Sequence, residues 1–306
     1  MRSFRLRCDE KHSDGFIIVA VLWLIGALAT LAVIYSLYVH QTAVAFVDHD
    51  ERLQAQALAM SGVELAVYRL TAVPERRPVT GRFSFRQGSA VVGVEFGSEN
   101  GHIDLNFASK NVLAGLFIGL GAPPDTAMSF ADRILAWRAP LAPTTTDSEA
   151  AIYQAAGKTY GPRHGPFQHV SELELVVGLP QWLIEKALPY LTVYSGRAEV
   201  NVLNAAPEVL AALPGLTPAL LQQLLEGRGA APQDVLQAQI GMAASYISLQ
   251  PCAANRINID VRFASGRRIH TKVVVLVLEN DTQPYRILSW HDEELSLDER
   301  DGARWQ

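Results

Sequence analysis

The residue types that could perform catalysis are sparse in this sequence of 306 residues. The nearest approach to a reactive cluster is His164 and His169, which lie close to Glu172 in a segment rich in Pro and Gly. These residues lack the spacing at which His and carboxylate side chains share a zinc ion. The sequence also lacks a Ser-His-Asp set, a phosphate-binding Gly loop and an H-E-x-x-H pattern. We therefore predict that the protein is not an enzyme and that these histidines lie in loops.

A second candidate chemistry is phosphate binding by a Gly hairpin. The segments 103–121 and 200–218 form a weak internal repeat, and their layout resembles helix-hairpin-helix and SAM-like units. This raises an alternative function, a membrane-tethered DNA-binding protein of a competence-like system. The hairpin LPGLTP ends at Pro218, which has no N–H to donate. No Lys or Arg occurs between Arg197 and Arg228, and the net charge is −5. Because phosphate contacts supply most of the affinity for DNA, we expect no nucleic-acid partner.

The elements that must position any site begin with an apolar segment. Residues 16–39 contain no charged residue, and as a helix they would span roughly 36 Å, enough to cross a bilayer. Basic residues precede the segment and acidic ones follow it. The positive-inside rule therefore predicts a single-pass protein with its N-terminus in the cytoplasm.

A cleaved Sec signal is the alternative for this segment, with Ala43-Val44-Ala45 as its cleavage site. The apolar run is longer than the usual 7–15 residues, and Asp14 lies almost against it. The helical pattern also continues to Val73, without Pro before Pro74. We therefore predict one long helix that stays in the protein. The second half of this helix should pack on a domain through one stripe of small to apolar residues: Leu58, Ser61, Leu65 and Tyr68.

The rest of the chain predicts an α+β fold. Residues 77–106 and the stretch from Arg256 onward alternate polar and apolar residues, as strands do. Between them, the period is helical from Phe107 to about Ala253. This order indicates a small antiparallel sheet interrupted by a helical insertion, whose two ends should lie close together. Within the insertion, Ser171 and Glu174 would fit a capping box.

The N-terminal pattern resembles type IV pilin-like precursors: a short charged leader ending in Gly15, then Phe16, then an apolar helix that becomes amphipathic. The resemblance implies that prepilin peptidase cuts between Gly15 and Phe16 and methylates the new N-terminus at Phe16. Most pilins have Glu at the fifth residue after the cut, where this chain has Ala20. That departure is typical of the protein K family of minor pseudopilins in type II secretion.

Several further segments resemble the protein K family, among them GHIDLNFAS, GPRHGPFQHVSELELVVGLP and VNVLNAAPEVLAALPGL. The resemblance runs from near the leader to about Trp290. It implies the following division: a prepilin leader at 1–15, a transmembrane helix at 16–39, the rest of the long helix and the first strands at 40–101, an inserted helical domain of two SAM-like units at 102–253, and closing strands with a tail at 254–306.

The resemblance also implies a function. The protein would cap the tip of the pseudopilus with the H, I and J type minor pseudopilins and help to initiate its assembly. The filament helps to export folded proteins across the outer membrane. The expected partners include prepilin peptidase and the inner-membrane assembly platform. The expected location is the bacterial inner membrane, with most of the chain in the periplasm.

Calcium is the one cofactor that the resemblance leaves open. Family members carry calcium-ligating acids in the loop that corresponds to 136–153. Here Ala136 and Arg138 flank Trp137, and only Asp147 and Glu149 remain as weak candidates. Calcium takes six to eight oxygen ligands, commonly with more than one carboxylate. A solvated loop without metal is therefore the favoured interpretation, and no cofactor is assigned.

Overall fold

The computed structural model describes residues 14–72, 77–141, 147–228, 241–278 and 281–295. The chain divides into two compact units, Met1–Ala57 and Leu58–Gln306. The longest element is helix α1, Asp14–Thr71, which has 58 residues. It has no Pro to interrupt its hydrogen bonds, and it ends where the Thr71 hydroxyl donates to the carbonyl of Val67.

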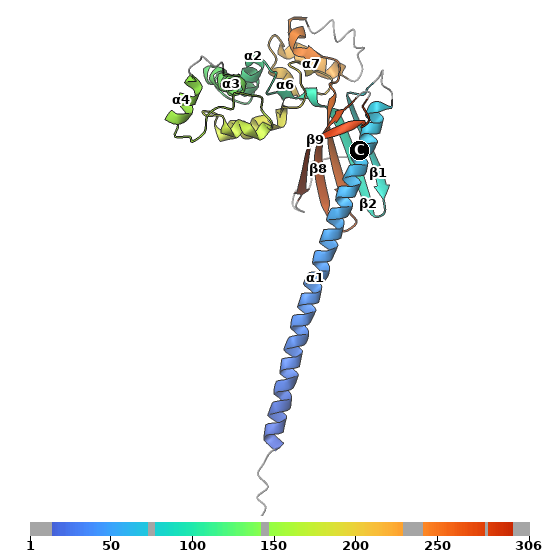
Figure 1. Cartoon of the computed structure of the whole chain (residues 1–306). Helices are drawn as coiled ribbons and strands as arrows, with labels where there is room; N and C mark the ends of the chain where they lie inside the picture. The colour runs from blue at the N-terminus through green and yellow to red at the C-terminus, as the bar shows by residue number, and fades with distance from the viewer. Residues whose placement is uncertain (1–13, 73–76, 142–146, 229–240, 279–280, 296–306) are drawn as a thin grey trace, which may run out of the picture. The chain divides into compact units, whose positions relative to one another are not determined.

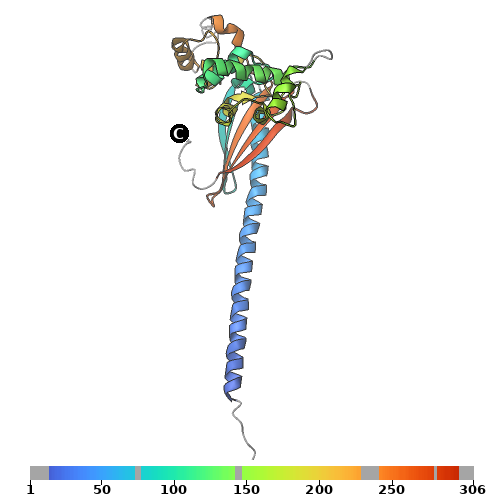
Figure 2. The ribbon, with the colours of Figure 1, turned by 90° about the vertical axis from the view of Figure 1, so that its left-hand side faces the viewer.

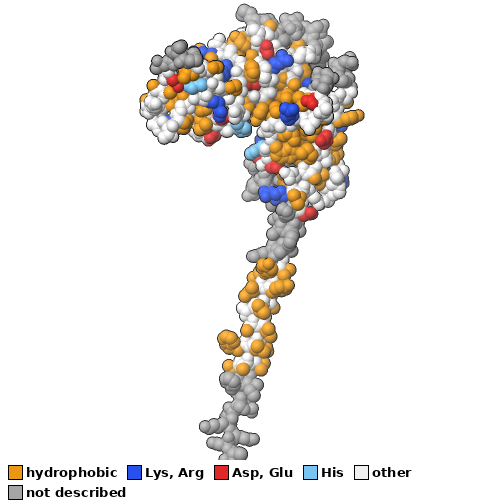
Figure 3. Space-filling model, viewed as in Figure 1, with side chains coloured by type: hydrophobic (Ala, Val, Ile, Leu, Met, Phe, Trp, Pro, Cys, Tyr) orange, Lys and Arg blue, Asp and Glu red, His pale blue; other side chains and the backbone are white. Residues whose placement is uncertain are grey.

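The first unit is the apolar half of α1. Ile18–His40 has a mean hydropathy of 2.5, and none of its residues is buried inside the structure. Figure 3 shows an almost continuous hydrophobic surface along this part of the helix. A helix of this length and composition is able to cross a membrane.

In the second unit, the last turns of α1 pack on a sheet. The buried stripe consists of Leu58, Ala59, Val63, Ala66, Val67 and Leu70. A side chain at Gly62 would come within 3.1 Å of Val94 and 3.4 Å of Ile259, so the small residue permits the close approach. The predicted stripe was wrong in phase, because Leu65 and Tyr68 are exposed.

The sheet has five antiparallel strands in the order β1-β2-β7-β8-β9. Their bounds are Thr80–Gln87, Ala90–Ser98, Ala254–Arg262, Arg268–Val277 and Tyr285–Leu295. Alternate residues of β2 and β7, such as Val92, Val94, Ile257 and Ile259, are buried. One face of the sheet therefore packs on α1, and the other face is in contact with solvent. The α+β class predicted from the sequence is confirmed.

The insertion between β2 and β7 is mainly helical and lies at the end of the sheet where β2 ends and β7 begins (Figures 1 and 2). Its elements are η2 (Glu99–Gly101), β3 (Ile103–Asp104), α2 (Lys110–Gly119), α3 (Pro124–Arg138), α4 (Ser148–Ala155), η3 (Val170–Leu175), α5 (Gln181–Ala187), η4 (Leu188–Tyr190), β4 (Leu191–Thr192), β5 (Val200–Asn201), α6 (Pro207–Ala211), α7 (Pro218–Gly227), η5 (Gly241–Tyr246) and β6 (Ile247–Ser248).

The internal repeat is visible in this insertion. Each copy starts with a short strand that pairs in parallel, β3 with β4 and β5 with β6. Each then turns by the same bond, in which the side chain of Asp104 or Asn201 accepts from the backbone N–H two residues on. The helices that follow touch at Gly115, where an added Cβ would lie 2.2 Å from the carbonyl oxygen of Ala212. One shared core therefore holds the two copies together.

Candidate functional site

The predicted processing site lies at the start of α1. Gly15 and Phe16 are within the helix, and their side chains are outside the described part of the chain. Ala20 lies one turn further on and is exposed. The helix surface around it carries no carboxylate from Ile18 to His40, and most of its side chains are apolar.

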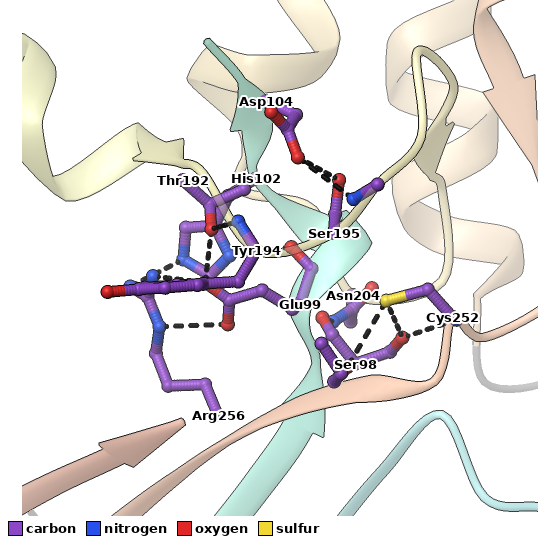
Figure 4. Close-up of polar contacts among 12 residues, drawn as sticks. Ser98, Glu99, His102, Asp104, Thr192, Tyr194, Ser195, Asn204, Cys252 and Arg256 are labelled. Atoms are coloured by element: carbon purple, nitrogen blue, oxygen red, sulfur yellow. Dashed lines mark hydrogen bonds and ion pairs between the residues drawn. The ribbon is translucent and has the colours of Figure 1, made fainter. Parts of the chain in front are cut away.

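The most elaborate polar arrangement is the junction, which we define as residues 98–104 together with 250–256, where the insertion leaves and rejoins the sheet. The two ends lie side by side: Ser98 pairs with Asn255 in the sheet. The amide of Asn100 donates to the carbonyl of Gln250 at 3.0 Å. The Ser98 hydroxyl accepts from the backbone N–H of Cys252 at 2.9 Å. The insertion is thus tied to the sheet by both of its ends (Figure 4).

A fully buried carboxylate lies at the centre of the junction. Glu99 has no exposed surface, and its Oε1 lies 2.6 Å from Nη2 of Arg256. The Arg256 Nε lies 3.1 Å from Oε2, so the pair is bidentate. Thr192 adds a hydroxyl donor at 2.6 Å. Charge, burial and hydrogen bonding are therefore matched at this carboxylate, as a buried ion needs.

His102 extends this arrangement. Its Nε2 lies 3.1 Å from Nη1 of Arg256, which can only donate, so Nε2 carries no proton. The Nδ1–H then donates to the backbone carbonyl of Glu99 at 3.3 Å. Burial first, and the Arg256 charge second, lower the pKa of His102 to about 4. The ring is therefore neutral at physiological pH.

A second buried carboxylate fixes the opposite side of the junction. Asp104 accepts from the Ser195 hydroxyl at 2.9 Å and from the Gly196 N–H at 3.0 Å. Its other oxygen accepts from the Asn106 N–H at 2.8 Å. Burial raises the pKa of Asp104, and these hydrogen bonds oppose that rise. All of its near partners are neutral donors, which suits a structural role.

The two calcium candidates are engaged by other side chains, Asp147 by His164 and Glu149 by Arg133. Asp147 caps helix α4 by accepting from the Ala150 N–H at 2.9 Å, and its other oxygen lies 2.8 Å from Nε2 of His164. These contacts, the helix N–H first, lower the pKa of Asp147. Both oxygens of Glu149 lie 2.9 Å from Nη1 of Arg133.

The described residues of this loop do not offer calcium a set of ligands. Arg138, at the end of α3, donates to the carbonyls of Leu105 and Ala108, so a guanidinium already uses these oxygen acceptors. Within the described residues, no group of three or more His, Cys, Asp and Glu side chains could share a metal ion. Asp147 and Glu149 contact different partners, His164 and Arg133.

His169, the second histidine of the predicted cluster, has a local structural role. His169 caps the 3₁₀ helix η3, because its Nδ1 accepts from the Ser171 N–H at 3.2 Å. The predicted capping box was therefore wrong: Ser171 lies inside the helix and Glu174 does not reach back to cap it. Glu172 instead binds Arg163, at 2.8 Å from its Nε.

The Gly hairpin is used for packing. Gly215 has a positive φ of 82°, which a Cβ would strain, and Thr217 caps α7 by accepting from the Leu220 N–H. Pro218 is the first residue of α7, a position where its missing N–H costs no helical hydrogen bond. This hairpin presents no cation of its own to a phosphate.

The sequence predicted that the two ends of the insertion lie close together, but it did not predict the buried ion pair between them. Glu99 and Arg256 are 157 positions apart, and neither belongs to a motif. The only available signal was an acid in the stretch SENG, between a predicted strand and a predicted helix. A carboxylate at such a boundary has no partner that can be identified without the fold.

A long N-terminal helix whose last turns pack on an antiparallel sheet defines a pilin-like protein. The comparisons with known proteins identify the relatives. Residues 97–196 match the family model for type II secretion system (T2SS), protein K. Type II secretion system protein K of Klebsiella pneumoniae is 31% identical over 129 residues, which cover 39% of this chain and 39% of that protein.

A solved structure extends the likeness to the fold. One chain of the GspK-GspI-GspJ complex from the type 2 secretion system of enterotoxigenic Escherichia coli superposes with a TM-score of 0.60 and 17% sequence identity. The match covers 81% of this chain and 99% of that one. Together these findings confirm the predicted resemblance to protein K, the K type minor pseudopilin.

Proposed function

We propose that this chain is a minor pseudopilin of a type II secretion system. The observation that carries the proposal is the combination of an exposed apolar helix at Ile18–His40 with a match of residues 97–196 to the protein K model. An uncharged helix of this kind is suited first to the membrane and then to packing against the helices of other subunits. We assign the chain no reaction of its own.

Prepilin peptidase would cut between Gly15 and Phe16 and methylate Phe16. The new N-terminal amine would then begin an apolar helix. Ala20 supports a place at the filament tip. A carboxylate in an apolar setting is costly unless it is paired, and a tip subunit has no subunit ahead of it whose amine could supply the charge.

The partners would be the H, I and J type minor pseudopilins. The related chain described above was crystallised in a complex with GspI and GspJ. Together these subunits would initiate the pseudopilus on the inner-membrane assembly platform, and the filament would help to move folded proteins across the outer membrane. The N-terminus would face the cytoplasm and the second unit the periplasm, in agreement with the charges that flank the apolar segment.

The helical insertion would form the cap, as a domain within 102–253. Its fixed attachment supports this role, because the two ends of the insertion are tied to the sheet by the buried Glu99–Arg256 pair and by Asn100. A cap that must present a defined surface to its partners benefits from such an attachment.

Co-purification tests the proposed function. The full chain with a C-terminal affinity tag is expressed with the I and J type subunits of the same system and extracted in mild detergent. We expect a stable complex that contains all three proteins. Tyr68→Glu, which adds a charge to an exposed position of α1 without entering the buried stripe, serves as a probe of the helix surface, and Arg197→Gln serves as a control far from it in sequence. Absence of both partners from the purified wild-type chain would contradict the proposal.

A further inference from the structure

The solvent face of the sheet carries a row of arginines. Residues that pair across strands share a face, and the strand register places Arg86, Val91, Arg262 and Arg268 in one row across β1, β2, β7 and β8. Their neighbours Val92 and Val261 belong to the buried face. Because side chains alternate along a strand, the row points away from α1.

Each acid near this row whose side chain the structure describes is bound to a residue outside the row. Glu95 lies 3.2 Å from Arg82. Asp260 lies 2.8 Å from His270. Glu293 lies 3.4 Å from Lys272.

Among the described side chains, these pairs leave the arginine row without a carboxylate partner. Over the part of the chain that the structure describes, Arg86, Arg262 and Arg268 take part in no ion pair or hydrogen bond of their side chains. Arg262 and Arg268 pair directly across β7 and β8. Like charges directly opposite each other destabilise a sheet, so the fold gains nothing from this arrangement. The chain has a net charge of −5, so this local cluster of arginines is suited to bind an anionic partner.

A groove runs beside the arginine row. It has a volume of about 370 Å³ and is lined by Arg82, Phe83, Ser84, Val91, Gly93 and Arg262. Gly93 lies opposite both Ser84 and Asp260, and a Cβ there would come no closer than 4.0 Å to any atom outside its neighbours. The missing side chain therefore leaves room above the sheet between two guanidinium groups, next to the exposed apolar surface of Val91.

We propose that this face binds an extended acidic segment of a protein partner. A carboxylate of the segment would pair with Arg262 and Arg268, since guanidinium groups bind carboxylates with paired hydrogen bonds. The neighbouring apolar residue of the segment would occupy the groove against Val91. The combination of cations with an apolar groove favours a peptide that carries neighbouring acidic and apolar side chains over a lipid surface, whose apolar chains lie beneath its phosphates. This inference rests on the sheet and does not depend on the proposed secretion role.

The test uses the full chain in nanodiscs of neutral phosphatidylcholine. The probe is a fluorescent octapeptide of alternating Glu and Val, and the same peptide with Gln in place of Glu is the neutral control. We expect the acidic peptide to bind and the neutral one not to bind. The double variant Arg262→Gln/Arg268→Gln should bind at least about tenfold more weakly, because each charged hydrogen bond contributes roughly 1.5–3 kcal/mol. Arg197→Gln/Arg286→Gln removes the same charge elsewhere and should bind as the wild type.

Three results would overturn the proposal. The first is that the wild-type chain binds neither peptide, or binds both equally. The second is that the two double variants bind the acidic peptide alike. The third is that phosphatidylglycerol vesicles, but not the peptide, bind in a manner that depends on Arg262 and Arg268. Thermal melting completes the test. The Arg262→Gln/Arg268→Gln variant should melt no lower than the wild type. A lower melting temperature would show that these arginines stabilise the folded chain, which would contradict the proposal.

Discussion

The apolar half of α1 and the junction have opposite distributions of polarity. From Ile18 to His40 the helix exposes large apolar side chains, and Trp23 is 78% exposed. At the junction the order is reversed, because Glu99 is completely buried with Arg256 and Thr192 around it. A soluble protein rarely exposes an apolar surface of this size, whereas it can bury a carboxylate that is paired and hydrogen-bonded.

The difference shows where the molecule depends on other molecules. From Ile18 to His40 the helix buries none of its residues in the described structure, so apolar surroundings such as a membrane or the helices of other subunits would stabilise it. The junction satisfies its buried ions with groups of the same chain and needs nothing from outside. The apolar half of α1 is therefore available for contacts with other molecules, and the junction fixes the helical insertion on the sheet.

The largest effect is expected from breaking the junction. Arg256→Ala leaves Glu99 buried without its cation, and removal of one partner of a buried pair costs about 3–5 kcal/mol. We expect the free energy of unfolding of the second unit to fall by that amount, measured by denaturant titration of the full chain in detergent. Arg82→Ala breaks a pair in which both side chains are about half exposed and should cost less than about 1 kcal/mol. Equal effects of the two substitutions would contradict the account of the junction.

A charge placed in the apolar segment Ile18–His40 tests whether this part of α1 lies in lipid. Leu28 lies near the middle of the apolar segment, and an arginine there costs about 2.5–3.5 kcal/mol on insertion into a membrane. We expect Leu28→Arg to reduce the fraction of the chain that resists alkaline extraction from membranes. Gln54→Arg, further along the same helix, is the control and should leave that fraction unchanged. Full retention of the Leu28→Arg chain would show that the segment is not held by lipid.

The junction should also make stability depend on pH through His102. Its pKa is about 4 in the folded chain and 6.5 without burial. The stabilisation of the neutral ring is therefore complete above about pH 6.5 and is lost as the pH falls toward 4, because the unfolded chain takes up a proton that the folded chain does not. The change amounts to about 3 kcal/mol at most. His102→Gln should flatten the stability curve over this range, whereas His291→Gln, at an exposed strand position, should not; a wild-type slope in the His102 variant would be evidence against this role.

The loop that holds Asp147 and Glu149 is intermediate between the two regions, since its ion pairs are only partly buried. We expect a calcium chelator to leave the melting temperature of the full chain unchanged, because Arg133 and His164 already bind the two carboxylates and Arg138 binds the nearby carbonyls. Arg133→Met should lower the free energy of unfolding by no more than about 1 kcal/mol. A melting temperature that falls with chelator and recovers with added calcium would overturn this interpretation.

The sequence predicted the elements better than their contacts. The long helix and the strands follow from uninterrupted periodic patterns, and Pro and Gly mark their ends. The phase of the buried stripe did not follow: Leu65 and Tyr68 have the right spacing for a buried face, but only the position of Val94 and Ile259 shows that the helix turns Gly62 toward the sheet. The Glu99–Arg256 pair was inaccessible for the same reason, since its two partners meet only after the insertion has folded.

The central claim is that the apolar half of α1 is an assembly element produced by cleavage. Its most direct test is the mass of the N-terminal peptide of the chain, isolated from membranes of cells that contain prepilin peptidase. We predict a peptide that begins with N-methylated Phe16, and the uncut chain when Gly15→Val blocks cleavage. A wild-type chain that begins at Met1, or after Ala45 as a Sec signal would leave it, would contradict the account.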